Sequence, residues 1–169
     1  MIPFAPGIPF QFLWNDGRVV MSLEAPVAGA NVLLSKQPPR PNAGVNVWVQ
    51  KRPGGRIYLV DTGGHATNFC LDVTLPGQQE AQGVFHNANG CLVYLNTDIP
   101  QRQTQLWQID PHGDGTYILR NTGLSLSIQY GPGAGPYVLD SGGNNSQGGS
   151  GKVWQLQQGN RNQYWTLQT

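Results

Sequence analysis

The amino-acid sequence predicts an all-β domain built from three copies of one four-strand unit, and three observations support this. The 169 residues include 23 Gly and 13 Pro, which are poor residues inside helices and common at turns. No stretch of about 12 residues keeps a helical apolar rhythm free of Gly and Pro. Three tryptophans, Trp48, Trp107 and Trp154, lie in similar apolar segments. Twelve short strands in three pseudo-threefold repeats describe a β-trefoil.

The tryptophans define the copies. Each is expected to begin the last strand of its unit and to lie in the core, because it recurs once per copy. Turn residues follow Trp48 at 52–55 and Trp107 at 110–115, and a new β-rich segment follows each turn, as in a hairpin. We therefore expect a single domain over residues 1–169, with repeats at approximately 1–54, 55–114 and 115–169.

The strands are expected in the same order in each unit. In the first unit a strand ends near Asn15, and the predicted strands of the chain after it are 20–23, 31–34, 47–50, 56–60, 69–73, 91–95, 106–109, 116–120, 124–128, 137–139, 153–156 and a closing segment at 164–167. Three units around one axis bury their apolar faces and remove free sheet edges. A β-sandwich is the alternative architecture, but it does not require three copies.

Composition excludes several classes of function. Only 11% of the residues are charged and the formal net charge is +1, so the clustered basic residues that nucleic-acid binding needs are missing. No apolar run is long enough to insert into a membrane. The N-terminal segment lacks both a basic region and an unbroken apolar region, so we expect no secretory signal and a cytoplasmic protein.

Catalytic and metal chemistry are also not indicated. The three histidines lie in Gly- and Asn-rich segments, and neither a His-Glu-x-x-His nor a Gly-x-Ser-x-Gly motif occurs. We therefore expect no enzyme activity, no catalytic residue, no metal site and no cofactor. Cys70 and Cys91 are too few for a disulfide framework or a cysteine zinc site. Two free thiols and one Cys70–Cys91 disulfide both remain open.

Short motifs in the middle copy resemble those of the ricin-B-type lectins. Gln105-Leu106-Trp107 matches the Gln-x-Trp motif of that family, Cys70-Leu71-Asp72-Val73 resembles the segment that opens its galactose site, and residues 86–89 resemble the approach to its aromatic strand. The fold-level resemblance covers the whole chain and the site-level resemblance covers residues 61–109. The Asn-, Gln- and Gly-rich composition is most similar to fungal cytoplasmic lectins and to mycocypins, which are protease inhibitors of the same fold.

The resemblance implies a sugar pocket in the middle copy. Asp72 would accept hydrogen bonds from two vicinal hydroxyls, and Tyr94 would be the aromatic platform for the sugar ring. Gln105 stands where the family has Gln, whereas Thr104 stands where it has Asn.

The other two copies lack these residues. The position of Asp72 is expected to correspond to Ser22 and Ser127, and that of Gln105 to Asn46 and Lys152. We therefore expect the sugar site of this family in the middle copy alone.

The function implied by the resemblance is defence-related binding of glycans or glycoproteins that contain galactose or GalNAc. A single site of this type binds weakly, so useful avidity would need oligomerisation, for example a homodimer, or a second and different site.

Protease inhibition is the alternative, with a cysteine or serine protease as the partner. The candidate loops are residues 61–68, with Gly63, Gly64 and Asn68, and residues 37–42, with Arg40. Gly63 and Gly64 would let the backbone approach a cysteine-protease cleft, Asn68 could face an asparagine-specific protease, and Arg40 a trypsin-like one. A scaffold that joins other proteins is a third interpretation.

Overall fold

The computed structural model describes residues 4–14, 19–35, 40–74, 88–127, 136–142 and 150–169. In this part of the chain, twelve strands form three four-stranded antiparallel sheets, which confirms the all-β prediction and fits the threefold repeat of a β-trefoil. The strands are β1 (Gln11–Trp14), β2 (Val19–Leu23), β3 (Val32–Ser35), β4 (Trp48–Gln50), β5 (Ile57–Val60), β6 (Ala66–Val73), β7 (Val93–Thr97), β8 (Trp107–Gly113), β9 (Thr116–Asn121), β10 (Tyr137–Asp140), β11 (Lys152–Gln155) and β12 (Thr166–Gln168).

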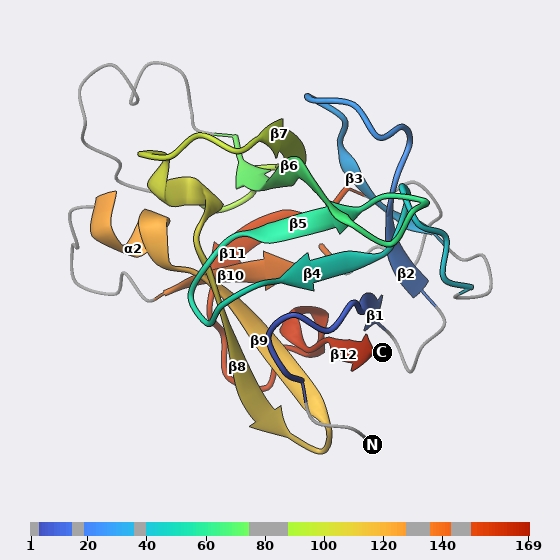
Figure 1. Ribbon diagram of the computed structural model, residues 1–169. Coiled ribbons are helices and arrows are strands. Elements are labelled where there is room, and N and C mark those ends of the chain that lie inside the picture. Colours follow the sequence, from blue (N-terminus) through green and yellow to red (C-terminus); the bar gives the residue numbers. More distant parts are fainter. Residues whose placement is uncertain (1–3, 15–18, 36–39, 75–87, 128–135, 143–149) are drawn as a thin grey trace.

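Six strands close a barrel. The pairs β12–β1, β4–β5 and β8–β9 are antiparallel ladders, the last with a register shift between Pro111 and Gly113. The gaps between them are closed by the bridges Phe10↔Trp48 and Tyr117↔Trp165 and by the hydrogen bond from Trp107 N to Gly55 O at 3.1 Å. The first and last strands lie side by side (Figure 1). Closure leaves no free barrel edge, so the sandwich alternative is not the architecture.

The remaining strands form three hairpins, β2–β3, β6–β7 and β10–β11. Isolated bridges join each hairpin to the other two: Asn31↔Tyr94, Leu33↔Ser150 and Leu92↔Lys152. The predicted repeat boundaries after residues 54 and 114 fall in the β4–β5 and β8–β9 turns.

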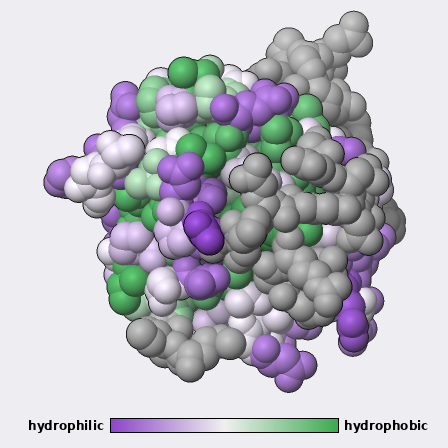
Figure 2. Space-filling view, turned by 90° about the vertical axis from the view of Figure 1, so that its right-hand side faces the viewer, coloured by the Kyte–Doolittle hydropathy of each residue, from purple (hydrophilic) through white to green (hydrophobic). Residues whose placement is uncertain are grey.

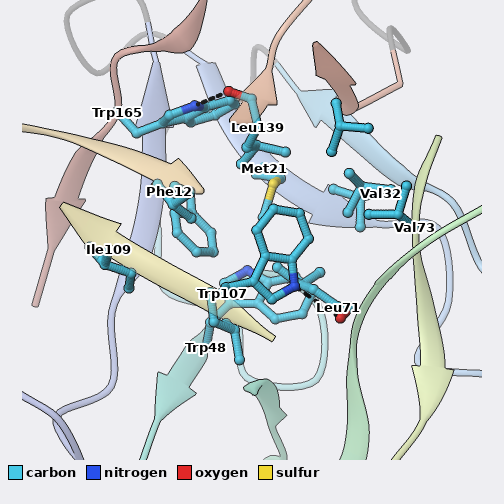
Figure 3. Packing of buried hydrophobic residues seen from close by; sticks show 14 of the residues in the cluster. Phe12, Met21, Val32, Trp48, Leu71, Val73, Trp107, Ile109, Leu139 and Trp165 are labelled. Carbon is cyan, nitrogen blue, oxygen red and sulfur yellow. Dashed lines mark hydrogen bonds between the residues drawn. The ribbon is translucent and has the colours of Figure 1, made fainter. Parts of the chain in front are cut away.

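The core contains one fully buried tryptophan from each unit, at the start of the last strand or directly before it: Trp48, Trp107 and Trp165 (Figure 3). Nε1 of Trp107 donates to Leu71 O, and Nε1 of Trp165 donates to Leu139 O, both at 3.1 Å. The prediction that Trp154 lies in this layer is wrong. Trp154 is on β11, the third strand of its unit, and 38% of its surface is exposed.

The predicted strand at 124–128 is also wrong. Residues Thr122–Ser127 form the short helix α2, and residue 128 lies outside the described residues. The side chain of Asn121 accepts a hydrogen bond from Leu124 N at 3.0 Å, as an N-cap residue does. This cap overrides the alternating Leu-Ser pattern that suggested a strand. The second strand of the third unit is therefore β10.

Cys70 is buried and Cys91 is half-buried, and both are free, so the two-thiol alternative holds. Burial raises the pKa of Cys70 to about 12 and also raises the pKa of Cys91, so neither thiol ionises readily near neutral pH.

Within the described ranges, no helix has the length and apolarity needed to cross a bilayer. Hydrophilic and hydrophobic residues are interspersed on the face in Figure 2.

Candidate functional site

The structure brings together the four residues of the predicted middle-unit site. Asp72 lies on β6 and Tyr94 directly opposite on β7, while Thr104 and Gln105 lie in the 3₁₀ turn η1 (Gln103–Gln105) before β8. The Thr104 hydroxyl donates to Asp72 Oδ1 at 2.6 Å. Gln105 Nε2 and the Tyr94 hydroxyl donate to Asp72 Oδ2 at 3.2 and 3.3 Å.

This cluster is filled by the protein's own side chains. Arg102 Nε forms an ion pair with Asp72 Oδ2 at 2.5 Å, and Asn96 Nδ2 donates to the same oxygen at 2.9 Å. The backbone N of Val73 donates to Oδ1 at 2.7 Å. The side chain of Asp72 has 0% exposure, so no part of the carboxylate faces solvent. Burial, followed by the charge of Asp72, raises the pKa of Tyr94. The middle cluster is thus a closed polar network.

The third unit repeats the same framework around Asp140. Gln163, in the 3₁₀ turn η2 (Arg161–Gln163), donates from Nε2 to Asp140 Oδ2 at 3.0 Å, as Gln105 does to Asp72. The same amide donates to Gln155 O at 2.9 Å, and its oxygen accepts from Gln157 N at 2.9 Å. Gln105 makes the equivalent bonds to Thr97 O and from Ile99 N.

Two sequence correspondences are therefore wrong. Asp140, and not Ser127, takes the position of Asp72, and Gln163, and not Lys152, takes the position of Gln105. The helix α2 occupies the place where the sequence predicts the second strand, so every later strand of the unit moves by one position. A second Gln-x-Trp motif, Gln163-Tyr164-Trp165, preceded by Asn162, was the signal that could have found this site.

Asp140 has different neighbours from Asp72. Its register partner on β11 is Lys152, and Trp154 lies two residues further, so both side chains are on the same sheet face as Asp140. Among the described residues, the carboxylate accepts hydrogen bonds only from Gln163 and from Gly142 N, the latter at 2.6 Å. The site therefore combines a buried carboxylate, 4% exposed, that has unused acceptor capacity, with an exposed indole and a half-buried lysine.

The first unit has no carboxylate at this position. Ser22 faces Leu33 where Asp72 faces Tyr94. Asn46 stands before Trp48 and accepts from Gln11 Nε2 at 3.1 Å and from Asn42 N at 2.8 Å. A cavity of about 380 Å³ lies beside these residues, with Ser22 and Asn46 in its wall. None of the described residues in its wall carries a carboxylate like that of the other two units.

The structure describes the first candidate inhibitory loop, residues 61–68, in full and the second only in part. Asp61 Oδ1 accepts from Gly63 N and from His65 N, each at 2.9 Å, and so holds Gly63 and Gly64 in an exposed turn. The bond from His65 lowers the pKa of Asp61. Asn68 does not belong to this loop as predicted. It lies in β6, where its carbonyl accepts from Asp98 N at 2.8 Å.

In the second loop, Arg40 is exposed, while residues 36–39 lie outside the described residues. The segment at 86–87, which the resemblance also used, lies outside them as well. In the described part of the chain, no three His, Cys, Asp or Glu side chains gather in a way that could hold a metal ion.

Comparison with known proteins identifies the fold. No family model and no curated protein matches the chain. Among solved structures, it is similar to ThreeFoil, a designed threefold-symmetric protein, with a TM-score of 0.67, 19% identity and coverage of 95% of this chain and 98% of that chain. The ricin B-like lectin of Macrolepiota procera, solved with lactose, gives a TM-score of 0.62 at 15% identity, with 99% of each chain covered.

A mosquitocidal holotoxin gives a TM-score of 0.68 at 16% identity, and the similarity covers 99% of this chain but 18% of the toxin. The three sheets and these neighbours together define the protein as a β-trefoil.

Proposed function

We propose that this β-trefoil binds carbohydrate and that the site lies in the third unit around Asp140. One observation carries the proposal. Gln163 holds Asp140 as Gln105 holds Asp72, and a backbone N–H bonds each carboxylate, but the other side-chain donors that fill the middle cluster have no counterpart at Asp140 among the described residues. The third unit therefore has the same Gln–Asp framework as the middle unit, but the described residues leave part of the acceptor capacity of Asp140 unused.

The chemistry of the site suits a sugar ring. A carboxylate accepts hydrogen bonds from two neighbouring hydroxyls, and the exposed face of an indole packs on the C–H-rich side of a pyranose. Asp140 and Trp154 supply these groups from adjacent strands. The Lys152 ammonium on the same face adds a donor, and the half-exposed Asn162, just before Gln163, adds an amide.

Galactose or GalNAc at the end of a glycan is the proposed ligand. The resemblance to ricin-B-type lectins and the lactose bound to the Macrolepiota procera neighbour support this choice. One carboxylate and one aromatic ring give a weak site, with a dissociation constant of roughly 0.1–1 mM.

A glycan array followed by calorimetry with lactose tests this proposal. We expect Asp140→Asn and Trp154→Ala each to weaken binding by about tenfold or more. Trp154→Ala should lower the unfolding midpoint much less than truncation of a fully buried tryptophan would, because 38% of its surface is exposed. The matched controls are Asp110→Asn, on an exposed pair in β8, and Trp165→Phe, which should lower the midpoint through the core. Binding of wild-type strength in both site variants contradicts the proposal.

Protease inhibition is a second proposal, and the Asp61 turn favours it. An inhibitor benefits from a loop that is already rigid, and Asp61 fixes Gly63 and His65 through two backbone hydrogen bonds. Assays against papain, legumain and trypsin test it. Inhibition that Asp61→Ala weakens would support this function, and full activity of all three proteases at micromolar protein would contradict it.

A further inference from the structure

A groove lies between the end of β1, the β8–β9 turn and the connection from β11 to β12. It encloses a cavity of about 770 Å³, which is within the range of roughly 300–1,000 Å³ found for small-molecule sites. The groove is separate from the Asp140 cluster, because neither Asp140 nor Trp154 lines it. The two sites meet at η2, whose Gln163 supports Asp140 while Arg161 lines the groove.

Three aromatic side chains line this groove and are fixed in place. The indole of Trp14 donates from Nε1 to Arg161 O at 3.0 Å. The rings of His112 and Tyr164 are stacked, with centroids 3.9 Å apart and an interplanar angle of 26°. The Tyr164 hydroxyl accepts from Gly159 N at 2.9 Å. The aromatic surface is therefore organised before any ligand arrives.

Polar side chains with unused hydrogen-bonding capacity form the rim of the groove. Asp114, Gln158 and Arg161 all line the groove and are exposed. Within the described part of the chain, none of these three side chains makes a hydrogen bond or an ion pair. Asp114 has φ 49°, a left-handed conformation that is uncommon for a residue other than glycine and that Asp tolerates better than most.

These groups select a class of ligand. The carboxylate of Asp114 and the guanidinium of Arg161 have opposite charges, so the rim does not favour a polyanion or a polycation. A carboxylate accepts from vicinal hydroxyls, a guanidinium donates to them, and aromatic rings pack on the apolar face of a sugar. We propose that this groove is a second carbohydrate-binding site, which takes a segment of an uncharged oligosaccharide independently of Asp140.

The five tryptophans allow both sites to be observed at once. In a ¹⁵N-labelled protein, the indole N–H of Trp14 reports on the groove and that of Trp154 on the Asp140 site. Trp48, Trp107 and Trp165 are fully buried and serve as internal controls. The probes are lactose, maltotriose, chitotriose and mannotriose, each added to about 10 mM, where a weak site is largely occupied.

We expect at least one probe to shift the Trp14 signal. The double variant His112→Ala/Asp114→Asn should weaken that response about tenfold and leave any Trp154 response unchanged. Asp140→Asn should weaken the Trp154 response about tenfold and leave any Trp14 response unchanged. Asparagine is used at position 114 because it also tolerates a positive φ.

The outcomes separate this inference from the proposed function. If probes shift Trp154 and none shifts Trp14, the groove proposal is overturned and the Asp140 site stands. A shift at Trp14 alone supports the groove and overturns the Asp140 site. If neither signal moves, both proposals fail. If Asp140→Asn removes both responses together, the groove is not an independent site.

Discussion

At the scale of single residues, Asp72 and Asp140 show that equivalent positions can have different roles. Both accept a hydrogen bond from the glutamine that precedes a buried tryptophan by two residues. Both residues are buried, with 0% and 4% of their surface exposed, but Asp72 is paired with Arg102, whereas Asp140 has only two hydrogen-bond donors among the described residues. A buried carboxylate with many donors supports the fold, and one with spare acceptor capacity can serve a ligand.

This difference predicts the effect of Asp72→Ala. The substitution leaves Arg102 without its anionic partner and deprives Thr104, Asn96 and Gln105 of an acceptor. We expect a loss of about 3 kcal/mol in the free energy of unfolding, measured in urea.

Two variants serve as controls for this measurement. Asp110→Ala removes a pair with Arg120 in which the side chains are 38% and 37% exposed, and should change stability by less than about 1 kcal/mol. Asp72→Ala/Arg102→Ala should recover part of the loss, because no unpaired charge remains. A change in Asp72→Ala no larger than that in Asp110→Ala would show that the middle network is not structural.

At the scale of elements, the close approach of α2 to η1 positions the middle network. A Cβ atom on Gly123 would overlap Gln103 O and lie 2.7 Å from Thr104 N, so only glycine fits there without a shift of the backbone. Asn121 reinforces the contact by donating from Nδ2 to Thr104 O at 2.7 Å. The helix that the sequence pattern missed therefore supports the turn that carries Thr104 and Gln105.

Gly123→Ala is predicted to destabilise the protein. The added methyl group must displace η1, and overpacking of this kind costs about 1–3 kcal/mol. Thermal unfolding followed by circular dichroism measures the loss. The control is Gly151→Ala, whose Cβ would make only ordinary contact, with Val32 Cγ1 at 3.5 Å. Equal midpoints for the two variants would contradict the tight α2–η1 contact.

At the scale of the whole molecule, β1 and β12 join the two ends of the chain. The register Phe12↔Leu167 closes the barrel, and both of these side chains belong to the single hydrophobic core. The core also contains tryptophans from all three units, so no unit buries its apolar face alone.

A chain that ends at Trp165 is therefore predicted to lose cooperative unfolding. It lacks β12, so β1 loses its ladder on that side and pairs only with β2, and the core side of Phe12 is exposed. Near-ultraviolet circular dichroism and urea titration measure this change. A chain that lacks only Thr169, which lies beyond β12 and is exposed, is the control and should unfold like the full chain. A truncated chain with an unchanged sharp transition would show that closure by β12 is dispensable.

Part of the site could also be predicted from the sequence. Asp72, Tyr94, Thr104 and Gln105 meet in space because a Gln-x-Trp motif places its glutamine beside the second strand of the unit. The sequence could not show that Arg102 and Asn96 fill this cluster, since a side chain's occupancy of a pocket depends on distances between separate strands.

The sequence by itself determined the fold, because turn residues and strand patterns are local and one buried tryptophan recurs in each unit. Which tryptophan is buried in the third unit was decided only by the tertiary structure. Trp154 and Trp165 both lie in strand-like segments, but the Asn121 cap turns residues 122–127 into α2 and leaves β10 as the second strand. That shift buries Trp165, exposes Trp154 and places Asp140 where the third unit keeps its carboxylate. Strand order within a unit is a non-local property, and here packing against the barrel sets it.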